Sequence, residues 1–135
     1  MTFMHAAQVR VLYADTDQMG VVNNVHYLRY FEIGRAEWIR ARGKAYKQIE
    51  DDGHRLPVVE AHLRYKESAR YDDVLDIETH VEEIRAASMT FAYAIRRHGD
   101  GALLCEGWSK HACLSADNKL VRFPDELLAL LRPNP

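Results

Sequence analysis

The hydrophobic period of this chain changes near residue 53, and that change limits the folds open to it. Between about residues 24 and 42, apolar side chains occupy one broad half of a helical wheel, which predicts a helix about 25 Å long. Beyond residue 53, apolar residues alternate with polar ones in the runs 59–65, 75–81 and 87–95. Such alternation is typical of antiparallel strands that bury one face. We therefore expect one long helix packed against a sheet.

Shorter patterns toward both ends complete the expected fold. Residues 7–13 alternate as a strand, and residues 102–114 give a fifth strand after the turn sequence His98-Gly99-Asp100-Gly101. A short helix is expected near residues 44–50, and another over residues 124–131, where a proline begins it. The predicted order is a strand, the long helix and then four strands in a meander.

One long helix covers a five-stranded sheet only if the sheet curls around it. The sequence thus predicts an α+β fold in which a five-stranded antiparallel sheet is curled around one long central helix, with a short C-terminal helix. The outer strands of such a sheet have unpaired backbone groups, which pair readily with another copy of the chain. We therefore expect a homodimer or a homotetramer.

Length and composition narrow the class of protein. The 135 residues suit one domain, residues 1–135, large enough to bury a core. A formal net charge of -2 disfavours broad nucleic-acid binding. No apolar run approaches the ~18 residues of a membrane span, and the first five residues lack the pattern of a signal peptide. These features favour a cytoplasmic protein without a membrane span.

The two cysteines, Cys105 and Cys113, are eight residues apart in one predicted strand. An extended chain separates them by roughly 26 Å, which is beyond disulfide reach. Neither their spacing nor that of the seven histidines fits a metal site. We expect two core thiols in a reducing compartment, and no metal.

The densest polar segment, residues 13–24, leads into the long helix. The N-terminus of a helix has free N–H groups and a partial positive charge, so this segment suits an anion or a developing oxyanion. Asp17 is ionised at neutral pH and is a candidate base or nucleophile, while Gly20 lets the backbone turn close to a ligand. Asp15 and Asp17 also suit turns or helix capping. Local composition leaves both interpretations open.

From residue 10 onward the chain contains a set of spaced residues: Arg10-Val11, Thr16-Asp17, Gly20-Val21-Val22, Asn24 and Tyr27. Further along come Tyr65-Lys66, Ala69-Arg70-Tyr71 and Arg122-Phe123-Pro124. This ordered set resembles the 4-hydroxybenzoyl-CoA thioesterase family, and in particular its acyl-CoA thioesterase branch, which includes Tol–Pal-associated enzymes. The resemblance covers nearly the whole chain, and it implies the hotdog fold.

The resemblance also implies roles for several residues. It makes Asp17 the catalytic carboxylate, acting on a thioester as nucleophile or general base, while backbone N–H groups near Asn24 polarise the carbonyl. Tyr13 is a further catalytic candidate, with a half-buried strand aromatic as the equal alternative. Many relatives have histidine where this chain has Asn24. Asparagine orients a substrate or a water but exchanges no proton near neutral pH, so a histidine-assisted mechanism is not expected here.

Substrate contacts are expected near the start of the long helix and in the family-like segments further along the chain. Coenzyme A is anionic and the chain has a negative net charge, so binding requires local basic groups. Lys66 and Arg70 lie in the family-like segments and are candidates, together with Gly20, Val25 and Tyr27 near the helix start. The alternatives are solvated surface charge for the two basic residues and core packing for Tyr27.

The sequence therefore predicts an acyl-CoA thioesterase that hydrolyses a thioester to a free acid and CoA, with neither metal nor cofactor. Its site is expected at the interface between subunits. Two alternatives remain open: a thioesterase acting on acyl carrier protein, and a non-catalytic module that binds acyl groups or CoA. The second follows from the missing histidine at position 24.

Overall fold

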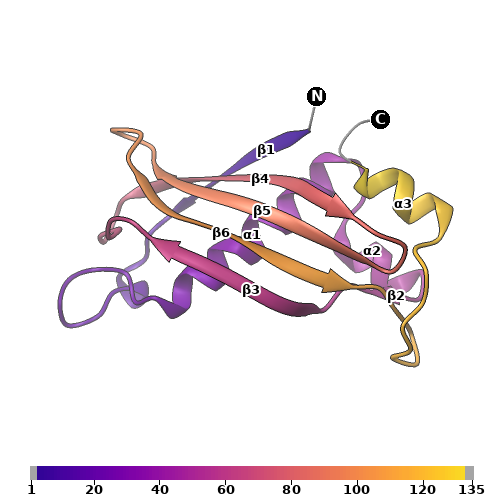
Figure 1. Ribbon diagram of the computed structural model, residues 1–135. Helices are drawn as coiled ribbons and strands as arrows, with labels where there is room; N and C mark the ends of the chain where they lie inside the picture. The colour runs from indigo at the N-terminus through magenta and orange to yellow at the C-terminus, as the bar shows by residue number, and fades with distance from the viewer. Residues whose placement is uncertain (1–2, 133–135) are drawn as a thin grey trace.

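A five-stranded antiparallel sheet curves around one long helix, as predicted. The computed structural model describes residues 3–132, so the ends of the predicted domain, residues 1–2 and 133–135, lie outside it. Residues 1–2, the start of the segment in which we expect no signal peptide, are therefore not described. The strand order is β1-β4-β5-β6-β3 (Figure 1). The strand bounds are β1 Met4–Arg10, β3 Val58–Tyr65, β4 Val74–Ile84, β5 Ser88–Arg97 and β6 Leu103–Ala112.

The predicted four-strand meander is wrong, because only β4, β5 and β6 follow one another in the sheet. Strand β1 pairs with β4, where Ala7 lies opposite Ile77, and β3 adds to the far side of β6, where Tyr65 lies opposite Cys105. Hydrophobic alternation identifies the face of a strand and not its neighbour. The edge strands are therefore β1 and β3.

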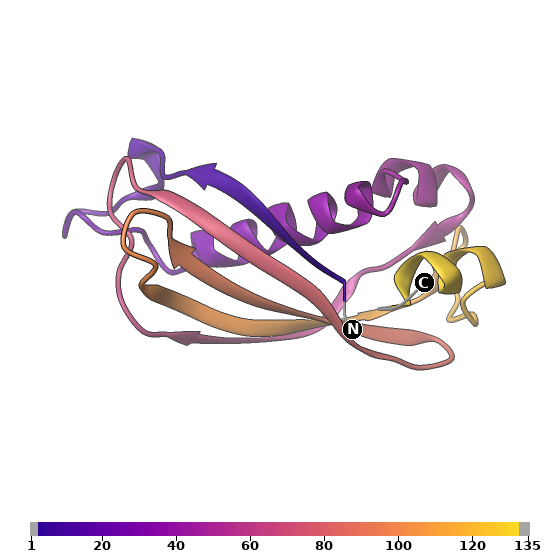
Figure 2. The same cartoon turned by 90° about the horizontal axis from the view of Figure 1, so that it is seen from above.

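The core lies between the sheet and helix α1, Val25–Ala41, which runs along one face of it (Figure 2). Phe31 of the helix stacks on Tyr93 of β5 with ring centroids 4.0 Å apart. Gly34 lets the helix approach β4, because a Cβ there would lie 2.6 Å from side-chain atoms of both Ile77 and Thr79. The full burial of each large apolar side chain contributes about 1.5–3 kcal/mol, so this layer holds helix and sheet together.

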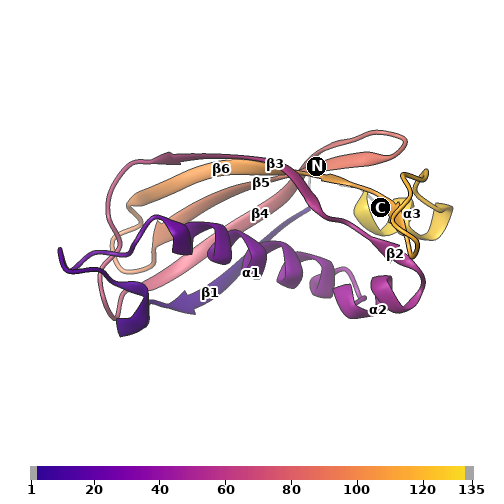
Figure 3. The same ribbon diagram turned by 90° about the horizontal axis from the view of Figure 1, so that it is seen from below.

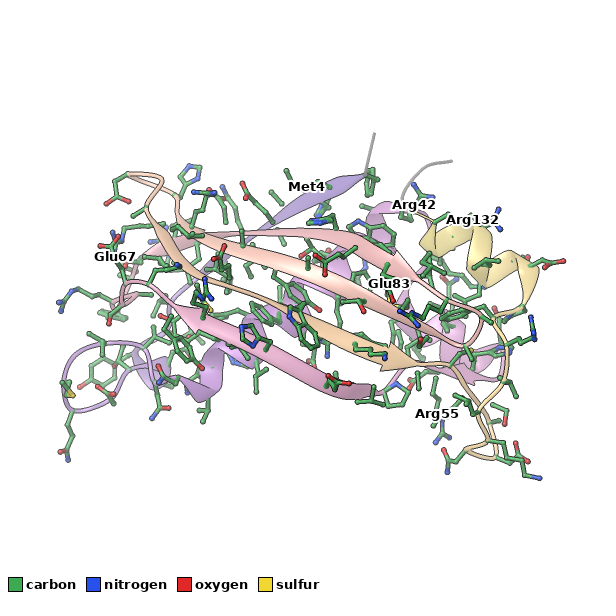
Figure 4. The ribbon with its side chains drawn as sticks, viewed as in Figure 1. Met4, Arg42, Arg55, Glu67, Glu83 and Arg132 are labelled. Atoms are coloured by element: carbon green, nitrogen blue, oxygen red, sulfur yellow. The ribbon has the colours of Figure 1, made fainter. Side chains whose placement is uncertain are left out.

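Smaller elements gather at the C-terminal end of α1 (Figure 3). They are α2 Tyr46–Asp51, the two-stranded ribbon of β2 His54–Arg55 with β7 Leu114–Ser115, and α3 Asp125–Leu131. The single turn η1, Tyr13–Asp15, lies at the opposite end, before α1. Arg42 joins α1 to α3 by donating hydrogen bonds to the carbonyl oxygens of Leu130 (3.0 Å) and Arg132 (3.1 Å). Figure 4 shows Arg42 and Arg132 side by side at this end. The polar loop 13–24 lies at the other end.

Strand β3 differs most from its sequence pattern. We expected its alternate residues Val59, Ala61, Leu63 and Tyr65 to form a covered face, but Val59 is 54% exposed and Tyr65 47% exposed. This expectation is wrong for the single chain because β3 is an edge strand, which α1 covers only in part. The thiols of Cys105 and Cys113, by contrast, are free and buried, as predicted. Within residues 3–132, no helix is both long and apolar enough to cross a membrane.

Candidate active site

The loop between β1 and α1 is fastened by a buried carboxylate. Asp15 accepts hydrogen bonds from the Leu12 N–H at 3.0 Å and from the Tyr30 hydroxyl at 2.8 Å, and its other oxygen pairs with Arg29. Burial raises the pKa of the Asp15 carboxyl, but these hydrogen bonds and the Arg29 charge outweigh it, so that the pKa lies below its ordinary value. Asp15 is therefore an ionised anchor, in agreement with the turn interpretation.

Asp17 lies in a tight turn two residues further on. Thr16 pairs with Val22, the Asp17 N–H donates to the Val21 carbonyl at 2.9 Å, and the Asp17 carbonyl accepts from the Gly20 N–H at 3.0 Å. Gly20 has a φ of 78°, which favours glycine. The turn thus fixes the backbone on both sides of Asp17.

The carboxylate of Asp17 is only partly engaged. It is half-buried, and its Oδ1 accepts a 2.8 Å hydrogen bond from the Met19 N–H. Within residues 3–132, the second oxygen accepts no hydrogen bond from the protein. Asp17 therefore retains an oxygen that can react with or hydrogen-bond to a ligand, whereas both Asp15 oxygens are occupied.

The start of α1, a few residues after Asp17, provides a backbone N–H donor. The Asn23 side chain accepts from the Val25 N–H at 3.1 Å, and the Asn23 and Asn24 carbonyls accept from the N–H groups of His26 and Tyr27. In the described part of the chain, the Asn24 N–H donates to no protein acceptor. It therefore lies at the positive end of the helix without a partner, where it can polarise a carbonyl oxygen.

The segment after β3 packs against this loop. The Val22 N–H donates to the Ala69 carbonyl at 2.9 Å, and Val21 pairs with Arg70. The hydroxyl of Tyr27 accepts from the Ala69 N–H at 3.2 Å, and burial raises the pKa of this phenol. Tyr27 is thus a core residue that holds the segment in place, as in the alternative given for it above.

The other predicted site residues are at the surface. Val25 and Asn24 are exposed at the helix start, and Arg70 is exposed beside Val21. The Nζ of Lys66 lies 3.8 Å from Oε1 of Glu106 on β6, and no contact joins it to the loop in residues 3–132. Gly20, Asn24 and Val25 therefore share one loop–helix junction with Asp17, and Arg70 adjoins it.

Tyr13 lies outside the strand in which we placed it. It belongs to the single turn η1 and is 77% exposed, with its ring edge-on to Tyr71 at 5.6 Å. The half-buried strand interpretation is wrong because β1 already ends at Arg10. The alternation of residues 7–13 extended beyond the last residue that pairs with β4.

The sequence did not predict a cavity of about 430 Å³ beside the C-terminal half of α1. Its walls come from α1, α2, β5, β6, the start of β3 and the two residues before β3; they are Glu32, Arg35, Ala36, Ile39, Tyr46, Leu56, Pro57, Val58, Phe91 and His111. The sequence feature that could have indicated the cavity is His111, a histidine within the predicted strand 102–114. His111 is 1% exposed, and burial lowers its pKa to about 4, so its ring is neutral.

Comparison with known proteins identifies the family. The model of the thioesterase-like superfamily matches residues 11–131, which is most of the chain and includes both the Asp17 turn and the cavity. The chain belongs to this superfamily. The predicted hotdog fold and the predicted class of enzyme, a thioester hydrolase, agree with that membership.

Individual proteins are similar to this chain over most of their length. The acyl-CoA thioesterase YbgC of Haemophilus influenzae is 33% identical over 123 residues, which are 90% of this chain and 89% of the relative. The solved structure of a protein from Aquifex aeolicus has a TM-score of 0.90 at 30% identity and covers 95% of this chain and 99% of its own. The DHNA-CoA thioesterase of Staphylococcus aureus has a TM-score of 0.84 at 28% identity, covering 88% and 80% of the two chains.

Proposed function

We propose that this thioesterase hydrolyses acyl-CoA thioesters to the free carboxylic acid and CoA, with Asp17 as its catalytic residue. The observation that carries the proposal is the pairing of a partly free carboxylate with an unpartnered N–H at the start of α1. The names of relatives such as YbgC give the substrate class. The reaction as proposed requires no metal and no cofactor, because the chain supplies both groups.

The proposed chemistry begins at the carbonyl oxygen of the thioester, which accepts a hydrogen bond from the Asn24 N–H. Negative charge grows on that oxygen in the transition state, where a fixed donor contributes about 10²–10³ in rate. As nucleophile, Asp17 attacks the carbonyl carbon, the C–S bond breaks, and water hydrolyses the resulting anhydride. As general base, Asp17 takes a proton from the attacking water, and the departing CoA sulfur is protonated. Both routes give the same products.

We further propose that the enzyme is at least a dimer, with the site shared between subunits. Strand β3 offers an exposed edge, and antiparallel pairing of two β3 strands is the simplest way to cover it. Such pairing reverses the strand ends. The Tyr65 end adjoins the start of α1, where Tyr65 and Tyr27 rings are 5.3 Å apart, while Val58 at the other end lines the cavity.

The start of α1 in the partner subunit then faces the cavity of this one. Asp17 of the partner subunit would act on the thioester while the acyl group enters the cavity. We expect the enzyme in the cytoplasm, since its buried free thiols fit a reducing compartment.

Replacement of Asp17 by asparagine tests the proposed function. The variant Asp17→Asn retains the shape of the side chain but removes its charge, so we expect thiol release from acyl-CoA esters to fall about 10²- to 10⁴-fold. Asp51→Asn, at an exposed position of α2, is the matched control and should retain full activity. Matched acyl-carrier-protein esters in the same assay identify the preferred carrier. Undiminished hydrolysis by Asp17→Asn, or binding of acyl-CoA without any hydrolysis by the wild type, rejects the proposal.

A further inference from the structure

A directed chain of hydrogen bonds runs behind the cavity. The carbonyl oxygen of Leu56 only accepts, so the Nδ1 of the neutral His111 ring donates to it at 2.9 Å, and Nε2 accepts from the Ser109 hydroxyl at 2.7 Å. The Ser109 oxygen in turn accepts from the Tyr93 hydroxyl at 2.5 Å. Each hydroxyl in the chain has thus already used its proton, and the Tyr93 oxygen is left as an acceptor.

The guanidinium of Arg35 is the charged group that acts on the Tyr93 end of this chain. Burial raises the pKa of the Tyr93 phenol, and the positive charge of Arg35 opposes that rise. The same charge also acts on the two other titratable rings of the cavity wall, His111 and Tyr46. Arg35 lines the cavity and its side chain is only 20% exposed, so its positive charge lies at the cavity wall.

Within residues 3–132, the one carboxylate close to the Arg35 guanidinium is that of Glu32, and the pair is weak. Glu32, one turn earlier on α1, is 3.9 Å away and 71% exposed, which makes a loose surface pair. Among the described residues that line the cavity, Arg35 has the one full positive charge and Glu32 the one carboxylate, and the remaining wall is largely apolar. A partly desolvated guanidinium of this kind binds a planar carboxylate strongly, through two parallel hydrogen bonds.

We propose that Arg35 determines substrate specificity by binding a carboxylate at the far end of the acyl group. The preferred substrates are then CoA monothioesters of dicarboxylic acids, whose methylene chain occupies the apolar part of the cavity. This inference rests on the proposed function, because it takes the cavity as the acyl-binding part of a thioesterase. Arg35 is distant in the chain from Asp17 and takes no part in breaking the thioester bond.

The test compares esters that differ only at the acyl terminus. Glutaryl-, adipoyl- and suberoyl-CoA are assayed beside pentanoyl-, hexanoyl- and octanoyl-CoA by thiol release. The wild type should have the higher kcat/KM for the dicarboxylic member of at least one pair. Arg35→Met should lower that value about 10- to 100-fold, mainly through KM, and should leave the methyl-terminated esters little changed. Arg35→Lys should restore part of the preference, because it restores the charge without the planar fork.

Glu32→Gln provides an independent check that leaves Arg35 in place. It removes the carboxylate that competes for the guanidinium, so the preference for dicarboxylic esters should rise. An equal loss on both ester classes in Arg35→Met, a wild-type preference for methyl-terminated esters, or a lower preference in Glu32→Gln overturns the inference while Asp17-dependent hydrolysis persists. A wild type that hydrolyses no ester of either class overturns the proposed function as well.

Discussion

The hydroxyl of Tyr30 donates a 2.8 Å hydrogen bond to the buried carboxylate of Asp15, and this contact joins the middle of α1 to the loop that holds Asp17. The two aspartates are two residues apart and have different surroundings. The carboxylate of Asp15 is enclosed by donors, whereas that of Asp17 has one oxygen without a protein donor in residues 3–132. One residue therefore stabilises the loop, and the other is available for chemistry.

Asp15→Asn should destabilise the protein. The variant removes the negative charge that the Tyr30 hydroxyl and the Arg29 guanidinium share, so we expect a loss of about 2–4 kcal/mol in the free energy of unfolding, measured by urea titration. Asp17→Asn is the matched control and should change stability much less. Equal stability of the two variants would contradict the anchoring role of Asp15.

Stability should also fall as His111 is forced to take up a proton. The folded pKa of His111 is about 4, below the unfolded value of about 6.5, so the unfolded chain binds a proton first as the pH falls. The stability due to the neutral ring is complete above about pH 6.5 and decreases by roughly 3 kcal/mol between pH 6.5 and pH 4.

Urea midpoints across that range measure this loss. His111→Gln should flatten the profile, because an amide can replace both ring hydrogen bonds without titrating. His62→Gln, at an exposed position, should retain the wild-type slope. The pKa of Asp15 is lowered, so its contribution is present above its unfolded value near 3.9 and is lost as the pH falls through the folded value. The loss of the Asp15 contribution occurs at lower pH than the range from pH 6.5 to pH 4, so it does not affect the test of His111.

Two glycine variants should separate folding from catalysis. Gly34→Ala places a Cβ 2.6 Å from side-chain atoms of Ile77 and Thr79, so it should cost about 1–3 kcal/mol in unfolding free energy while folded enzyme keeps its kcat. Gly20→Ala meets no neighbour within 4 Å, but its positive φ costs an alanine about 1–2 kcal/mol and disturbs the Asp17 turn. We expect Gly20→Ala to lose more kcat than Gly34→Ala. The reverse order, in thermal melts paired with steady-state assays, would contradict the assignment of the turn.

Mixing two inactive variants tests whether the site is shared between subunits. Asp17→Asn lacks the carboxylate, and Ala36→Trp fills the cavity, so each alone should be inactive. Joint refolding of the two variants gives heterodimers. If the carboxylate and the cavity of one site come from different subunits, each heterodimer has one site in which the Asp17 carboxylate and the cavity are both native. About a quarter of wild-type activity should then return in an equal mixture. No recovery, in samples that light scattering shows to be dimeric, would place both parts of the site in one subunit.

Much of the fold was predictable because it depends on local patterns. The helical period gave α1 to within about one residue at each end, and the alternation of β4 and β5 gave their buried faces. The neighbours of β3 were not predictable, because pairing with β6 depends on contacts between residues far apart in sequence. Tyr13 was misplaced for a related reason, since alternation does not mark where strand pairing stops.

The candidate site was also predictable only in part. The order of Asp17, Gly20 and Asn24 near the start of a helix is a sequence property, so it pointed to the junction that the structure contains. The cavity is built from segments that are distant in sequence and lie around Leu56 and His111, and no local motif marks it. The different environments of Asp15 and Asp17 also depend on Tyr30, fifteen residues away, whose orientation only the packed helix fixes.

The exposure of β3 has a consequence for the newly made chain. A single chain presents an unpaired strand with exposed apolar side chains on both faces, and another unpaired strand can bind there. In the proposed dimer, assembly would therefore protect the chain as well as complete the site, and preparations that assemble slowly should be the ones that aggregate.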